Sequence, residues 1–311
     1  MRIRSHLFSF SACLVALVAV PLSVSGETGS QNARVGNGVD ASRALVFADR
    51  QRQLFEQIGK SACYARAGVD ESAHFVELRK ASARFSVVLS AQVNGSTELA
   101  LHAEPDPDIR ARLAALAKVW HPHGEAIQFY LAAPAVEEYA LALNAFFSDS
   151  TRMANDLGDL SRAIVSAGGE VGIIDPVLSN AINIAGRQRM LLQRMSKQIC
   201  FVGTWIEPDL NKALLKGAAA LFESTKAELY RTLENLEISA SLRVEFARRT
   251  QRSNAIWLEF RKRIENIIAA DTYSPDNLAY VARNDDALLA ALEAERALLV
   301  RLAIHEKPAP R

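Results

Sequence analysis

Residues 181–201 read AINIAGRQRMLLQRMSKQICF, and the spacing of apolar side chains in and just after this stretch decides the fold class. The apolar residues recur at intervals of three, four or seven, which stacks them along one side of a helix: Ile184, Leu191, Met195, Ile199 and Val202. Elsewhere the chain is rich in Ala, Leu, Glu, Arg and Lys, and it has no long run of alternating β-branched residues. The sequence therefore predicts an all-α protein.

The same stretch has a counterpart in the first half of the chain. ADRQRQL at 48–54 corresponds to AGRQRML at 185–191, and the same displacement in numbering, which we call the repeat offset, superposes Trp120 on Trp257 without a gap. Trp is rare here, with 3 in the whole chain, so agreement by chance is improbable. The repeat offset indicates a tandem duplication of a unit of roughly 130–140 residues.

Helix breaks divide each copy into four segments. They fall near Gly68, 104–107, Pro134 and 168–169 in the first copy, and near Pro208, 237–239 and 274–275 in the second. Segments of about 25–35 residues suit an up-down-up-down four-helix bundle. We therefore expect one bundle over residues 41–169 and another over 175–306, packed through their first helices. Pro122 should kink or split the third helix of the first bundle.

Residues 1–26 have the layout of a secretory signal peptide. Two arginines, at positions 2 and 4, precede an apolar run over 14–24, and small residues follow it. This pattern predicts an exported, periplasmic protein, and Cys13 leaves a lipoprotein signal as the lesser alternative. Gly, Ser and Asn are frequent in residues 27–40, which predicts a flexible leader.

The composition excludes several classes of function. The 311 residues contain 36 Lys and Arg against 35 Asp and Glu, so no global charge attracts nucleic acid or an anionic membrane. No later segment approaches the roughly 18–20 apolar residues that cross a bilayer. No nucleophile motif or phosphate loop is present, so we expect neither an enzyme nor a cofactor. His121 and His123 form the one metal-like motif, and without an accompanying Glu-x-x-His pair we expect no metal site.

The stretch at 181–201 resembles the start of a PilJ-type domain, the N-terminal domain of type IV pili methyl-accepting chemotaxis transducers. It also resembles the periplasmic sensor domains of NarX- and NarQ-type nitrate sensors. The specific part is Ala-Ile-Asn-Ile-Ala-Gly-x-x-Arg-Met followed by Gln-Arg-Met, and a weaker likeness covers 44–64. The resemblance implies a periplasmic four-helix sensor bundle without catalytic residues.

The resemblance also implies a ligand site. In the nitrate sensors an arginine from each of two first helices holds one small oxyanion, nitrate or nitrite. The matching arginine is Arg189, with Gly186 close to the ligand, and the duplicated positions are Arg52 and Asp49. A guanidinium group offers a rigid fork of donors that suits a planar oxyanion, and glycine allows close approach of the backbone.

The two cysteines that remain after signal removal also correspond at the repeat offset. Cys63 follows Arg52, and Cys200 follows Arg189, by the same spacing of about three helical turns, which keeps each pair on one helix face. If the first helices pack in parallel, Cys63 faces Cys200, and an exported pair predicts a disulfide. The alternative is two buried free thiols.

The first copy departs from the motif in two places. Asp49 stands where the motif has Gly, and Glu56 stands where the second copy has Gln193. Both carboxylates share a helix face with Arg52, so they could neutralise the two arginines internally. Three alternatives stay open: a small anion occupies the site, the built-in carboxylates leave it without a ligand, or another ligand binds there.

These patterns predict an exported, non-enzymatic protein that senses a small oxyanion and takes part in chemotaxis-type signal transduction. Without a membrane span of its own, it would signal through a membrane receptor or histidine kinase. The alternative is a structural or adaptor module of a chemoreceptor or type IV pilus-associated complex that binds no small ligand. Arg187 and Arg194 are expected to be solvated or to form interhelical ion pairs.

Overall fold

The computed structural model describes residues 29–170, 176–236, 238–270 and 275–305. This part of the chain contains eight α-helices and one isolated β-bridge, so the prediction of an all-α protein is confirmed. The helices are α1 (Gly29–Arg66), α2 (Glu71–Asn94), α3 (Pro107–Ala132), α4 (Glu137–Glu170), α5 (Pro176–Gly203), α6 (Pro208–Glu234), α7 (Ala240–Ala269) and α8 (Pro275–His305). The predicted signal peptide, residues 1–26, lies outside the described residues.

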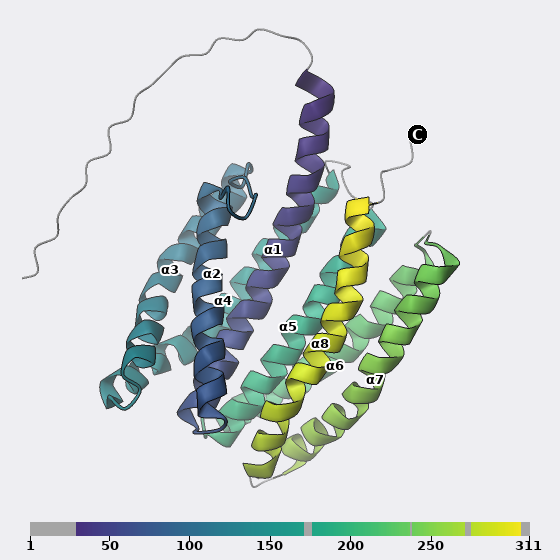
Figure 1. Ribbon diagram of the computed structural model, residues 1–311. Coiled ribbons are helices and arrows are strands. Elements are labelled where there is room, and N and C mark those ends of the chain that lie inside the picture. Colours follow the sequence, from purple (N-terminus) through teal and green to yellow (C-terminus); the bar gives the residue numbers. More distant parts are fainter. Residues whose placement is uncertain (1–28, 171–175, 237, 271–274, 306–311) are drawn as a thin grey trace, which may run out of the picture.

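Helices α1 and α5 lie side by side at the centre of the molecule (Figure 1). Helix α1 packs against α2 and α4, and α3 completes the first group of four. Helix α5 packs against α6 and α8, and α7 completes the second group. The two first helices therefore form the main interface between the groups.

Local sequence explains where the helices begin. Four of them, α3, α5, α6 and α8, start at a proline, which has no N–H to leave unsatisfied at the first helical position. Asp106 caps α3, because its carboxylate accepts the backbone N–H groups of Asp108 and Ile109.

Two local expectations differ from the structure. Residues 29–40, expected to be a flexible leader, form the first turns of α1. They contain no proline, and extending an existing helix costs far less than starting one.

Pro122 does not split α3, which is continuous on both sides of it. Trp120 and His123 flank this proline and are both buried, so packing holds the helix together.

Both groups of four make the same core contacts at positions related by the repeat offset. The Gln51 side-chain amide donates to the Phe85 carbonyl over 3.0 Å, and the Gln188 amide donates to the Phe222 carbonyl over 2.8 Å. Trp120 and its counterpart in the second copy pack on these two phenylalanine rings, with centroids 4.5 and 4.2 Å apart. The duplication therefore extends from sequence to individual contacts.

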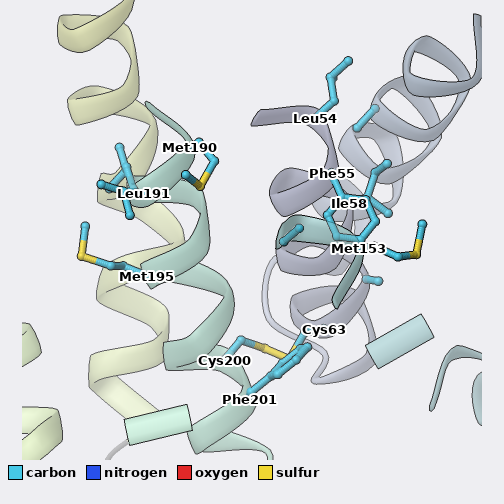
Figure 2. Packing of buried hydrophobic residues seen from close by; sticks show 14 of the residues in the cluster. Leu54, Phe55, Ile58, Cys63, Met153, Met190, Leu191, Met195, Cys200 and Phe201 are labelled. Carbon is cyan, nitrogen blue, oxygen red and sulfur yellow. A yellow bond between two sulfur atoms is a disulfide. The ribbon is translucent and has the colours of Figure 1, made fainter. Parts of the chain in front are cut away.

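Several large apolar side chains of α1 and α5 point away from the interface between the two helices. Figure 2 shows Leu191 and Met195 of α5 directed into the second group, whereas Phe55 of α1 is directed into the first. Phe55 packs against the rings of Phe85 and Phe146, which belong to α2 and α4. This arrangement leaves the polar sides of α1 and α5 facing each other.

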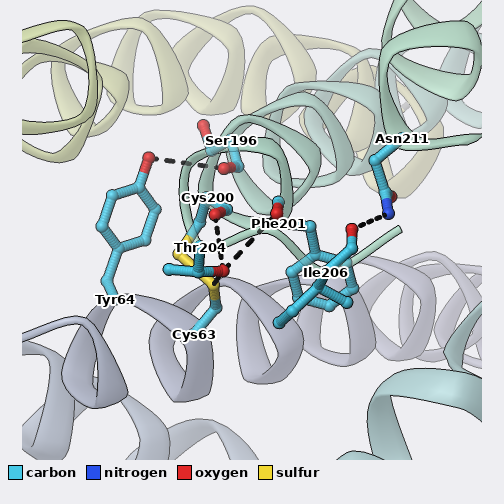
Figure 3. Close-up of a disulfide and its surroundings, with 8 residues drawn as sticks. All are labelled: Cys63, Tyr64, Ser196, Cys200, Phe201, Thr204, Ile206 and Asn211. Atoms are coloured by element: carbon cyan, nitrogen blue, oxygen red, sulfur yellow. Dashed lines mark hydrogen bonds between the residues drawn. A yellow bond between two sulfur atoms is a disulfide. The ribbon is translucent and has the colours of Figure 1, made fainter. Parts of the chain in front are cut away.

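A disulfide joins α1 to α5 near their carboxyl ends (Figure 3). Cys63 and Cys200 are bonded with their Cα atoms 6.2 Å apart, so the predicted bridge is confirmed. Close to it, the Thr204 hydroxyl donates to the Cys200 carbonyl over 2.9 Å. Because the bridge links equivalent positions, it holds α1 and α5 in register.

Candidate functional site

Charged side chains line the interface of α1, α5 and α8. We call the buried ones the charged seam: Asp49, Arg52, Glu56 and Lys60 of α1, Arg189 and Lys197 of α5, and Asp285 and Arg296 of α8. Every one of these residues is less than a tenth exposed. A buried charge without a partner is costly. The ion pairs within the charged seam therefore determine whether any charge is left over to bind a ligand.

The carboxylate of Asp49 lies at the centre of three guanidinium groups. Arg189 Nη1 is 3.1 Å and Arg296 Nε is 2.7 Å from Asp49 Oδ2. Arg52 Nη2 is 3.3 Å from Asp49 Oδ1. Arg52 and Arg189, the two arginines expected at the ligand site, therefore converge on one point, and the Asp49 carboxylate occupies that point.

Gly186 makes room for this carboxylate. A Cβ atom at Gly186 would lie only 1.7 Å from Asp49 Oδ1 and 2.2 Å from Asp49 Cγ. Asp49 and Gly186 are equivalent positions of the two copies, so a side chain in one copy fits against the missing side chain of the other. The resemblance to the nitrate sensors places Gly186 close to a ligand, whereas in the structure Gly186 accommodates Asp49.

Replacing Gly186 with alanine is expected to lower the free energy of unfolding by about 1–3 kcal/mol, because the Asp49 carboxylate is held by three arginines and cannot move aside freely. Urea unfolding measures the loss. Gly217→Ala in α6 is the matched control, since nothing lies within 4 Å of the added Cβ there. This control should gain about 0.5–1 kcal/mol from helix propensity. Equal effects of the two variants would contradict the fit described above.

Positive charge exceeds negative charge around Asp49. Glu293 Oε2 lies 2.6 Å from Arg189 Nε, so three guanidinium groups face two carboxylates. Arg52 also donates to Asn183 Oδ1 over 3.1 Å, but its Nε has no hydrogen-bond partner among the described residues. Burial lowers the pKa of both Arg52 and Arg189, although guanidinium remains charged at neutral pH.

Two residues of α8 that the sequence motif does not indicate, Arg296 and Glu293, also contribute to the site. Arg296 and Glu293 have no arginine or glutamate at the equivalent positions of the first copy, where Asp159 and Asp156 stand. The motif covers the first helix alone, so it carried no signal for these two residues. Only the packing of α8 on α5 brings them to Asp49.

Glu56 forms a second cluster of charges, separate from the three arginines around Asp49. Its carboxylate lies 2.7 Å from Arg194 Nε and 2.7 Å from Lys197 Nζ. Burial by itself would raise the pKa of Glu56, but the two cations outweigh burial and lower it. The expected neutralisation of Arg52 and Arg189 by Glu56 is therefore wrong, because Arg194 and Lys197 reach its carboxylate directly across the seam.

Lys60 forms a third cluster with carboxylates from two other helices. Its Nζ is 3.2 Å from Asp285 Oδ2 of α8 and 3.4 Å from Glu77 Oε2 of α2. Glu77 also accepts from Ser61 Oγ over 2.8 Å and contacts His74 Nδ1 at 3.3 Å. The burial of Glu77 favours a higher pKa, but these donors outweigh burial and lower its pKa to about 2.

This shift predicts acid sensitivity. The pKa of Glu77 falls from 4.5 to about 2 on folding. The stabilisation that the ionised Glu77 carboxylate gives to the folded state is therefore complete above pH 4.5 and is lost as the pH falls toward 2. The wild type should therefore lose roughly 2–3 kcal/mol more than Glu77→Gln across this window. Urea unfolding at a series of pH values measures the difference. Glu259→Gln removes only an exposed pair with Lys262 and should follow the wild-type profile.

No helix in the described ranges is both long and apolar enough to span a membrane. Within the same ranges, no group of three or more His, Cys, Asp or Glu side chains is arranged to hold a metal ion. His123 contacts Asp149 at 3.2 Å, and His121 lies 3.8 Å from Glu125.

Comparison with known proteins gives a family match within the second group of helices. Residues 178–286 match the family model described as PilJ, type IV pili methyl-accepting chemotaxis transducer N-term. No curated protein and no solved structure matches the chain. The match begins in α5 and includes Gly186, Arg189, Cys200 and Asp285. Residues 178–286 are therefore similar to a PilJ-type domain, a sensory or signalling domain of the kind associated with chemotaxis transducers.

Proposed function

We propose that this protein is an exported, non-enzymatic adaptor in chemotaxis-type signalling, built from two PilJ-type bundles over residues 41–169 and 175–306. The family match supports the signalling role, and the contacts repeated at the repeat offset support the two-copy architecture. In this proposal the charged seam is architectural. It fixes the two bundles against each other instead of receiving a ligand.

The position of Asp49 carries this proposal. Its carboxylate contacts Arg52, Arg189 and Arg296 and fills the space beside Gly186. A carboxylate resembles nitrate in charge and in its planar oxygens, so it satisfies the same guanidinium donors. The carboxylate is covalently attached and loses no association entropy, whereas a free anion does. A dissolved anion therefore competes poorly for this position.

Thermal unfolding with and without nitrate or nitrite tests the role of Asp49. The melting temperature of the wild type should not rise in millimolar nitrate beyond its change in sodium chloride of equal ionic strength. Asp49→Ala should melt lower than the wild type, and nitrate should raise its melting temperature, because the anion binds only the native state. Asp49→Ala combined with Arg189→Ala should show no such recovery.

A sensor for a small oxyanion is the second candidate function. It is favoured by the excess of guanidinium groups at Asp49 and by the unpartnered Nε of Arg52. A saturable, nitrate-specific rise in the melting temperature of the wild type that Arg189→Ala abolishes would establish the sensor and refute the adaptor with a built-in counter-ion.

The adaptor also requires a membrane partner, for which a chemoreceptor or a histidine kinase is the natural class. Tagged protein should co-purify with such a partner from detergent-solubilised membranes of its source organism. Recovery should be the same with and without nitrate, since the adaptor carries no anion signal. A partner released or captured only in nitrate would favour the sensor.

A further inference from the structure

A groove lies between α2 and α3 in the first group of helices, outside the charged seam. Its volume is about 560 Å³, within the range of small-molecule sites. Leu89, Val93 and Trp120 supply apolar side chains to its lining. Gly124 also lines the groove, and an added Cβ atom there would lie 3.3 Å from Trp120 Nε1. Because Gly124 has no side chain, the indole of Trp120 forms part of the wall of the groove.

The second copy carries longer side chains at the equivalent positions. At the repeat offset, Ser86 and Gly124, which both line the groove, correspond to Glu223 and Arg261. The glutamate and the arginine pair across α6 and α7, with Arg261 Nη1 2.9 Å from Glu223 Oε1. An ion pair in one copy therefore spans the space between two helices that the other copy leaves open.

A second link between the helices is also specific to the second copy. The Tyr230 hydroxyl lies 3.4 Å from Asn254 Oδ1 and so joins α6 to α7. The equivalent residues of the first copy, Val93 and Ala117, line the groove and have no polar side-chain atoms. The core contacts beneath are the same in both copies, so the two copies differ here in the outer residues that would cover the groove.

Hydroxyl and amide groups of α2 lie within reach of a molecule in the groove. Ser86, Ser90 and Asn94 line the groove and are all exposed, and their four-residue spacing places them on one face of the helix. The Asn94 side-chain amide donates to Ser90 Oγ over 3.3 Å. Ser86 Oγ accepts the indole N–H of Trp120 over 2.9 Å. These groups can exchange hydrogen bonds with a bound molecule in place of water.

The charge of the lining restricts the class of ligand. The residues that line the groove include one carboxylate and no lysine or arginine. The carboxylate belongs to Glu125, which is 59% exposed and lies 3.8 Å from His121 Nε2. An anion that entered the groove would lose water without gaining a cationic partner. An uncharged molecule avoids this cost.

We propose that the α2–α3 groove binds a small, uncharged aromatic molecule. The ring of the ligand packs against Trp120 in the space beside Gly124, where aromatic side chains favour offset or edge contacts. The hydroxyl groups of Ser86 and Ser90 form hydrogen bonds with the polar group of the ligand. This site is independent of the charged seam and of the adaptor role proposed above.

A matched pair of ligands tests the charge requirement. At neutral pH 2-naphthol is uncharged and 2-naphthoate is an anion, and both carry the same two fused rings. Calorimetric titration should show saturable binding of 2-naphthol, and 2-naphthoate should bind about tenfold more weakly or less. Equal affinity for the two compounds would overturn the proposal, as would the absence of saturable binding at millimolar 2-naphthol.

The second copy supplies variants that close the groove. Ser86→Glu combined with Gly124→Arg introduces the ion pair of Glu223 and Arg261, which the second copy carries beside its own tryptophan, so this double variant should remain folded. It should weaken 2-naphthol binding about tenfold or more, because the new side chains fill the space beside the indole. Unchanged binding would overturn the proposed position of the ligand.

A second double variant and a control complete this test. Val93→Tyr combined with Ala117→Asn introduces the other link of the second copy, and it should also weaken 2-naphthol binding. Val87→Glu adds a charge to α2 at a position that is 48% exposed and outside the lining of the groove. This control should bind as the wild type does. Equal weakening by Val87→Glu and by the double variants would refute the assignment to the groove.

The indole N–H signals in a nitrogen–proton correlation spectrum give a local readout. Trp120 lines the groove, Trp257 is buried in the second group, and Trp205 is 71% exposed. Trp120→Phe assigns the signal of Trp120. Titration with 2-naphthol should shift this signal saturably and leave that of Trp257 in place. Shifts confined to Trp205 or Trp257 would refute the site even if calorimetry detected binding.

Discussion

Replacing Asp49 with alanine is expected to lower the free energy of unfolding by about 3–5 kcal/mol, because the change leaves buried guanidinium groups without their shared carboxylate. Asp49 is fully buried and contacts Arg52, Arg189 and Arg296 at 2.7–3.3 Å. Urea unfolding at pH 7 measures the loss as a lower midpoint with an unchanged slope.

Glu293→Gln is the control for this prediction. Glu293 also pairs with Arg189, but its side chain is 45% exposed, so water can replace much of the lost interaction. We expect this variant to lose less than about 1 kcal/mol. If Asp49→Ala costs no more than Glu293→Gln, the carboxylate of Asp49 is not the counter-ion that holds the seam together.

Removing the disulfide is expected to lower the free energy of unfolding by about 2–5 kcal/mol. Cys63 and Cys200 are 137 residues apart, and the chain-entropy model assigns a loop of this length roughly 5 kcal/mol of stabilisation through the unfolded state. Comparison of Cys63→Ser combined with Cys200→Ser against the wild type in urea measures the difference.

Reductant provides the matched control. Dithiothreitol should shift the urea midpoint of the wild type toward that of the double variant and leave the double variant unchanged. If complete reduction leaves the wild-type urea midpoint unchanged, the disulfide does not contribute to the free energy of unfolding. The contacts of the charged seam then hold α1 against α5 without it.

The fold was largely predictable because its signals are local. The spacing of Leu191, Met195 and Ile199 specifies a helix with one apolar side, and prolines mark the starts of several helices. The Gly, Ser and Asn content of residues 29–40 predicts a flexible leader, but these residues continue the helix that follows them. Composition alone does not show where an existing helix stops extending.

The candidate site was predictable only in part. The resemblance to the nitrate sensors implied Arg189, and the duplication added Arg52 and Asp49; two parallel helices in register then place equivalent residues opposite each other. The partners of Glu56 were not found, because Lys197 and Arg194 reach it through long side chains whose direction the helical spacing leaves open. Glu77 was also missed, since its link to Lys60 depends on how α2 packs against α1.

The amino-acid sequence by itself determined the helical class, the tandem duplication and the helix faces that carry the arginines and cysteines, because each is encoded in spacing along the chain. Only the tertiary structure decided that Asp49, held by Arg52, Arg189 and Arg296, fills the space beside Gly186. The occupant of that space depends on the approach of α8 and on distances of a few ångströms between helices, which no spacing within one helix specifies.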